Sequence, residues 1–170
     1  MVSSGEKSFY VGATVGGSEK KLEIHKEKNK TKVLINNKEE KKQSLLAQEL
    51  AILCIHPGSH NLIEGPPSER RAFLDWGLFH VEQDFKKEWA SYIKLLKQRN
   101  EALKTRALKD DIWLEKLAEA GEQITKMRAS HMVNLNKHFQ QNKEHILPNL
   151  ELSFLYEQGW EENSSLFDSL

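Results

Sequence analysis

Two apolar stripes with heptad spacing constrain the fold more than any other feature of the sequence. The first stripe advances by alternating steps of four and three residues through Phe85, Trp89, Tyr92, Leu96, Arg99 and Leu103. The second keeps the same alternation through Trp113, Leu117, Ala120, Ile124, Met127 and His131, and ends with another step of four to Leu135. An average step of about 3.5 residues is typical of helices that pack along a common seam. Because only the short segment 105–111 joins the stripes, they predict an antiparallel helical hairpin that ends near Pro148.

The part of the chain before position 56 has the pattern of strands. Apolar residues alternate or cluster in 8–15, 22–24 and 32–35, with polar turns between these segments, which predicts an antiparallel meander of about three strands. A short helix over 43–49 and a buried strand over 50–55 are expected next. Alternating apolar residues in 150–156 predict a late strand that returns to the sheet. The predicted fold class is α+β, a small antiparallel sheet followed by a long antiparallel helical hairpin. Since so small a sheet is marginal alone, we expect sheet partners from a longer protein.

The run 56–82, HPGSHNLIEGPPSERRAFLDWGLFHVE, joins a Gly/Pro turn to the start of a helix. Pro66 and Pro67 suit a helix entrance, because the first helical turn has N–H groups without intrahelical partners. Arg70 and Arg71 follow in that turn, where the helix dipole disfavours positive charge, so each needs a compensating partner. That partner is either an acid such as Glu69 or Asp75, or DNA phosphate or another lobe of a longer protein, which a planar guanidinium binds well.

This run resembles the central signature of RecF, the bacterial recombination-repair ATPase family of the SMC/ABC-like class. The residues that carry the resemblance are Pro57, Leu62, Ile63, Gly65, Pro67, Arg70, Arg71, Phe73, Leu74 and Asp75. Gly58 and Pro66 depart from the family pattern, which has an acid and a small residue at these places. The similarity continues to Arg128 and to Gly159–Trp160, and therefore covers most of the chain.

The resemblance implies a domain division and a function. Residues 1–64 would be the antiparallel β part of the ATPase lobe, 65–148 the helical arm lobe, and 149–170 the returning strand with an acidic tail. The full-length protein would use ATP and magnesium, form an ATP-dependent homodimer, and bind DNA at single-strand gaps or double-strand/single-strand junctions. With RecO and RecR it would load recombinase in the cytoplasm, as part of DNA replication, recombination, repair and the SOS response to DNA damage.

The residues themselves give no sign of a nucleotide or metal site. No GxxxxGK[ST] motif occurs, and no acid closes an apolar strand as a Walker B Asp would. We therefore expect an internal fragment without the phosphate loop, Walker B or ABC signature, and no nucleotide hydrolysis by this chain alone. His131, His138 and His145 recur every seven residues, about 10 Å apart along a helix, which is too far for one metal ion, so no metal or cofactor is predicted.

The single cysteine and the hydropathy bear on the cellular compartment. Cys54 lies in an apolar run, which predicts a buried structural thiol, and one cysteine cannot form an internal disulfide. No apolar run approaches the ~20 residues needed to cross a bilayer, and no signal peptide precedes the first strand. These features favour a cytoplasmic protein with no membrane partner.

Charge is distributed unevenly although Lys+Arg and Asp+Glu are both 25. Positions 86–109 hold eight basic residues against two acidic ones. Such a helix either attracts a DNA backbone in a salt-dependent way or is a solvated face. The candidates for DNA binding or lobe docking are Arg70, Arg71, Lys94, Lys97, Arg99, Lys104 and Arg106. Arg99 also falls on the apolar stripe, where a buried polar contact is expected.

Two functions from different classes fit the sequence. The first is part of a RecF-like protein, in which this segment supplies the arm and part of a DNA-facing surface. The second is a stand-alone helical hairpin that binds a protein partner, without DNA or nucleotide. An inactive gene product is a third interpretation that the sequence leaves open.

Overall fold

The computed structural model describes residues 5–17, 19–105, 112–161 and 163–170. The chain forms two compact units, Met1–Pro57 and Gly58–Leu170, which are described separately. The domain division expected from the family resemblance stays a prediction.

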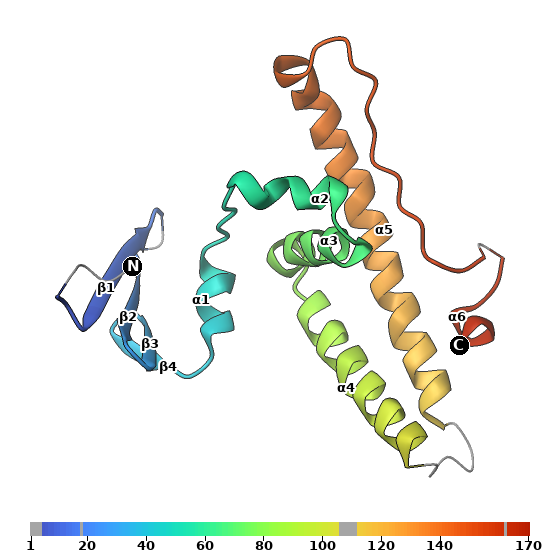
Figure 1. Cartoon of the computed structure of the whole chain (residues 1–170), viewed down its shortest axis with the longest axis horizontal. Coiled ribbons are helices and arrows are strands. Elements are labelled where there is room, and N and C mark those ends of the chain that lie inside the picture. Colours follow the sequence, from blue (N-terminus) through green and yellow to red (C-terminus); the bar gives the residue numbers. More distant parts are fainter. Residues whose placement is uncertain (1–4, 18, 106–111, 162) are drawn as a thin grey trace. The chain divides into compact units, whose positions relative to one another are not determined.

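The first unit contains an antiparallel meander (Figure 1). Its strands are β1 (Ser8–Val15), β2 (Lys20–Glu27), β3 (Lys30–Ile35) and β4 (Lys38–Glu40), and they pair in sequence order. Leu22 on β2 lies opposite Ala13 and Ile35, and Leu22 and Val33 are the buried apolar residues among those described in this unit. Asn36 and Asn37 have positive φ angles of 51° and 66°, as a two-residue hairpin turn with the twist of the strands requires. The predicted meander is thus confirmed and has four strands rather than three.

The strand predicted over 50–55 is not present. Helix α1 (Gln43–Glu49) forms as expected, and Lys20 Nζ bonds Glu49 Oε2 at 2.6 Å. The following residues have no strand partner among those described, and Ile52 and Ile55 are 67% and 84% exposed. Cys54 is exposed as well, so the prediction of a buried thiol is wrong. The apolar residues of this run gave it a high strand propensity. A strand also needs a neighbouring strand to pair with, and the described residues do not provide one.

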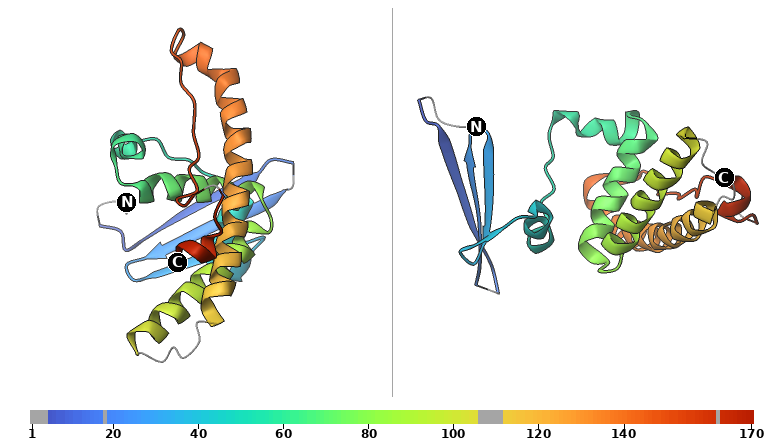
Figure 2. Two further views of the ribbon diagram at one scale, coloured as in Figure 1. Left: turned by 90° about the vertical axis from the view of Figure 1, so that its right-hand side faces the viewer. Right: turned by 90° about the horizontal axis from the view of Figure 1, so that it is seen from below.

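The second unit is built on the predicted helical hairpin. It begins within a 3₁₀ turn, η1 (Pro57–His60), whose first residue closes the first unit, and it continues with α2 (Asn61–Glu64), α3 (Pro67–Val81), α4 (Phe85–Lys104) and α5 (Ile112–Ile146). Helices α4 and α5 pack side by side and run antiparallel, as Figures 1 and 2 show. The main cluster of buried residues is Leu78, Phe85 and Ile124, which come from α3, α4 and α5. The hairpin is confirmed, and α3 packs against both of its helices.

Glycines allow two close approaches to α5. A Cβ atom on Gly77 of α3 would lie 2.6 Å from His131 Nε2, so α3 approaches α5 where that glycine leaves space. A Cβ on Gly121 of α5 would meet Leu166 at the start of the last helix, α6 (Leu166–Ser169). Both helices therefore come nearer to α5 than a larger residue would permit.

The tail runs back along α5 over residues 147–161 (Figure 1), and these residues form no strand. Three α5 side chains bind its backbone: Lys143 Nζ donates to Leu150 O at 2.6 Å, Gln140 Nε2 to Leu152 O at 2.5 Å, and Asn136 Oδ1 accepts from Phe154 N at 3.3 Å. The rings of Phe139 and Phe154 are 4.7 Å apart. The predicted late strand is therefore corrected: residues 150–156 form no strand, and their backbone binds side chains of α5 instead of a neighbouring strand.

Candidate nucleic-acid interface

Arg70 joins α2 to α3 at the corner formed by Gly65 and the two prolines. Pro67 is the first residue of α3, as predicted. Arg70 Nη1 donates to the carbonyls of Leu62, Ile63 and Gly65 at 3.4, 3.2 and 2.9 Å. These carbonyls belong to the C-terminal end of α2, where a helix carries partial negative charge and accepts cations. The expected compensating partner of Arg70 is thus a group of backbone oxygens and not Glu69 or Asp75.

Arg71 is exposed and has no ion pair among the described residues. It differs from Arg70 in that its guanidinium is not engaged by α2. It remains the candidate of the arginine pair for contact with DNA or with another lobe.

Asp75 of α3 forms an ion pair with Arg128 of α5. Arg128 Nε and Nη2 bond Asp75 Oδ1 and Oδ2, both at 2.7 Å, and the two side chains are 19% and 20% exposed. Burial lowers the pKa of Arg128, but the hydrogen bond and charge of Asp75, with a smaller contribution from Tyr156, raise it above its usual value. A two-bond arginine–carboxylate pair fixes both position and orientation. This pair therefore fixes how α3 packs against α5.

Sequence reasoning did not find the Asp75–Arg128 pair. The two residues are 53 positions apart, and neither has a local pattern that identifies its partner. Both lie in the region of family resemblance, which is the one signal that could have drawn attention to them. The same holds for the polar pocket beside Trp160, described below.

A basic face on α4 carries most of the remaining candidates. Since helical residues turn by about 100° each, one side of α4 holds Lys86, Lys87, Lys94, Lys97 and Lys104. Lys94, Lys97 and Lys104 are exposed; Lys104 lies 3.6 Å from Glu101, and Lys86 Nζ lies 5.7 Å from the centre of the Phe79 ring. A groove of about 320 Å³ beside this face is lined by Ile93, Leu96, Lys97, Asn100, Glu101 and Lys104. Exposed ammonium groups in a row suit a phosphate backbone.

The structure does not bring all the predicted residues together. Arg99 is half-buried on the side of α4 that faces α5, away from the lysines. Arg70 and Arg71 lie at the start of α3, whereas α4 follows its end, so about 16 Å of helix separates them from Lys86. Arg106 lies outside the described residues. The candidates therefore form an α4 face and a separate α3 corner.

Two absences complete the description of the site. The residues that the structure describes contain no group of three or more His, Cys, Asp or Glu side chains placed to hold a metal ion. In the same part of the chain, no helix is long and apolar enough to cross a membrane.

The fold and site define an α+β segment in which a small antiparallel sheet precedes a helical arm with a basic face. No protein-family model matches the chain. Curated relatives named DNA replication and repair protein RecF do match. The relative from Haemophilus influenzae is 40% identical over 144 residues, 82% of this chain and 40% of its own length. The one from Enterobacter sp. is 34% identical over 170 residues, 97% of this chain and 48% of its own length.

A solved structure supports the same assignment. It is described as the recombination mediator protein RecF with ATP in the RecFOR pathway, and it superposes with a TM-score of 0.68 at 25% identity, over 84% of this chain and 41% of its own. The chain belongs to the RecF family. It spans less than half of the length of the curated relatives described above.

Proposed function

We propose that this chain is part of a RecF-like DNA replication and repair protein, and that the basic face of α4 contacts the DNA backbone. The observation that carries the proposal is the row of exposed lysines on one side of an arm helix. Family membership supports it, because the relatives are named for replication and repair.

The proposal for the whole protein goes further and rests on the family. It binds ATP with magnesium, forms an ATP-dependent homodimer and recognises gapped DNA or a double-strand/single-strand junction in the cytoplasm. With RecO- and RecR-type partners it loads recombinase during the response to DNA damage. The solved RecF structure supports this picture, since its description includes ATP and the RecFOR pathway. For this chain we propose no nucleotide hydrolysis, because it has no phosphate-loop motif.

Salt dependence of duplex binding tests the DNA-contact proposal. Each phosphate neutralised by a lysine contributes about −0.9 to the slope of log K against log salt. The variant K94E/K97E removes two such contacts, so we expect the slope to flatten by about two and the affinity at low salt to fall at least tenfold. The matched control is K28E/K30E, which makes the same charge change at the turn between β2 and β3.

Two results would contradict this function. One is duplex binding that does not change between low and high salt. The other is an equal loss of binding in K94E/K97E and in K28E/K30E, since net charge and not the α4 face would then account for the effect.

A protein-docking role is the second candidate, favoured by exposed apolar residues on α4. Trp89, Ile93 and Leu103 are 41%, 39% and 47% exposed. If α4 docks a protein, replacing Trp89 with Ala weakens a pulled-down complex and leaves duplex binding unchanged. If α4 contacts DNA, the lysine variants show the effect instead.

A further inference from the structure

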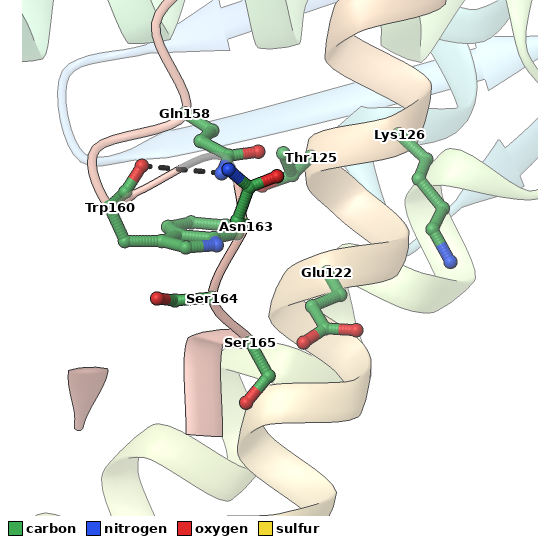
Figure 3. A pocket seen from close by; sticks show the side chains of 8 residues that line it. All are labelled: Glu122, Thr125, Lys126, Gln158, Trp160, Asn163, Ser164 and Ser165. Atoms are coloured by element: carbon green, nitrogen blue, oxygen red, sulfur yellow. Dashed lines mark hydrogen bonds between the residues drawn. The ribbon is translucent and has the colours of Figure 1, made fainter. Parts of the chain in front are cut away.

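A polar pocket lies between α5 and the end of the tail, in a place that the proposed DNA contact does not use. Its volume is about 390 Å³ (Figure 3). Helix α5 contributes three of the lining residues and the tail the rest: Glu122, Thr125, Lys126, Gln158, Trp160, Asn163, Ser164 and Ser165. A volume of this size accommodates a large side chain or a small ligand.

Hydrogen bonds hold both walls of the pocket in place. Gln158 Nε2 donates to the carbonyls of Trp160 and Glu161 at 3.2 and 3.1 Å, which folds the tail into a turn. Glu122 Oε1 accepts from Leu166 N at 3.0 Å and ties the start of α6 to α5. Ser165 caps α6 by accepting from Asp168 N at 3.2 Å. The pocket is thus bounded by α5, by the turn at 158–161 and by the capped start of α6.

The acceptors that remain for a ligand are carboxylate and amide oxygens beside an aromatic ring, and the hydroxyls of Thr125 and Ser164 and the amide of Asn163 can accept as well as donate. The amide nitrogen of Gln158 is engaged, which leaves its oxygen, and Glu122 has a second carboxylate oxygen. The indole of Trp160 forms one side, and Figure 3 shows the Lys126 side chain pointing away from it. A guanidinium has five N–H donors and no acceptor, and it stacks on indole faces. This chemistry complements the pocket.

The acidic residues around the pocket also favour a positively charged ligand. Glu115, Glu119 and Glu122 follow each other by four and three residues, and so share one face of α5. The tail from 149 to 170 contains five acids and no Lys or Arg. Lys126 is the basic residue in the pocket lining, and the surrounding acids outnumber it, so the surface favours a basic segment over phosphate.

We infer that this pocket receives an arginine side chain from a basic segment of a protein partner. Trp160 stacks on the guanidinium, Glu122 accepts its hydrogen bonds, and the acidic tail attracts the residues on either side. This surface is separate from the α4 face, so either inference stands without the other.

The test is a titration of the 170-residue chain with a blocked peptide, Gly-Ser-Arg-Lys-Ser-Gly, followed by NMR of the tryptophan indole N–H signals. The signal of Trp160 is assigned with Trp160→Phe. We expect it to shift saturably, while the same peptide with neutral citrulline in place of arginine gives no saturable shift. Glu122→Gln should weaken binding about tenfold, because it removes a charged acceptor but keeps the oxygen that Leu166 needs. Glu144→Gln, an equal charge change on an exposed part of α5, should have no effect.

Several outcomes would overturn the inference. Equal binding of the arginine and citrulline peptides excludes guanidinium recognition. A Trp160 shift caused by a short DNA duplex, with none caused by the peptide, makes the pocket a nucleic-acid site. An equal effect of Glu122→Gln and Glu144→Gln reduces the binding to general charge attraction. Absence of any Trp160 shift with 10 mM peptide (about a hundredfold excess over protein) rules out the site, because a site with a Kd of about 1 mM would be about 90% occupied at that concentration.

Discussion

Breaking the Asp75–Arg128 pair should destabilise the helical unit and leave the sheet unit unchanged. The pair makes two hydrogen bonds of 2.7 Å with side chains 19% and 20% exposed, and so lies between a surface pair and a buried one. Surface pairs contribute up to about 1 kcal/mol, whereas removing one partner of a buried pair costs about 3–5 kcal/mol. We therefore expect Arg128→Met or Asp75→Asn each to lower the free energy of unfolding by about 2 kcal/mol.

A double-mutant cycle measured by urea unfolding gives the coupling directly. All four tryptophans lie in 58–170, so their fluorescence reports this unit alone. With slopes of about 1–3 kcal/mol/M in urea, a change of 2 kcal/mol moves the midpoint by about 1 M. The coupling between Asp75 and Arg128 should approach 2 kcal/mol, against less than about 0.5 kcal/mol for the exposed control pair Glu101–Lys104. A coupling no larger than that of the control pair would refute the view that Asp75–Arg128 positions α3 on α5.

Three further changes test the packing on α5. Gly77→Ala places a Cβ 2.6 Å from His131 Nε2 and should cost about 1–3 kcal/mol in urea unfolding, with most of the loss recovered in a His131→Ala background. Burial lowers the pKa of His131, so the unfolded chain binds a proton more readily than the folded one, and stability should fall as pH drops through about 6.5. Replacing His131 with Gln should flatten this pH profile of the free energy of unfolding. Lys143→Met removes the bond to Leu150 O, and hydrogen exchange read by mass spectrometry should quicken in 150–156 but not in α4.

The sequence pattern predicted the helical hairpin and the start of α3 well, because heptad spacing and the position of a proline act on nearby residues. Heptad spacing places Leu117 and Ile124 on one side of α5, and they are 1% and 3% exposed. Pro67 takes the first position of α3, where its missing N–H costs nothing. Trp89 and Leu103 are exceptions on the first stripe, since they are 41% and 47% exposed although the spacing directs both to the seam.

Partners far apart in sequence could not be predicted in the same way. The alternation of 150–156 indicates an extended segment, but it does not say whether a strand or a helix will face it. Likewise, the first turn of α3 shows that Arg70 needs compensation, and the choice of backbone carbonyls over Asp75 follows from the corner at Gly65. Asp75 is therefore available to pair with Arg128 on α5, a partner 53 positions away that no local pattern identifies.

The three hydrogen bonds between the tail and α5 form the rungs of a ladder, and their spacing limits how many rungs the ladder can have. One helical turn advances about 5.4 Å, whereas two residues of extended chain advance about 6.6 Å, so each further rung accumulates a mismatch of about 1.2 Å. Three hydrogen-bonded rungs, from Lys143 to Asn136, are therefore close to the largest number that this mismatch in spacing allows. Inserting one residue after Asn149 would turn the opposite edge of the tail towards the helix and break all three rungs together, whereas inserting two would shift the ladder by one rung and preserve most of it.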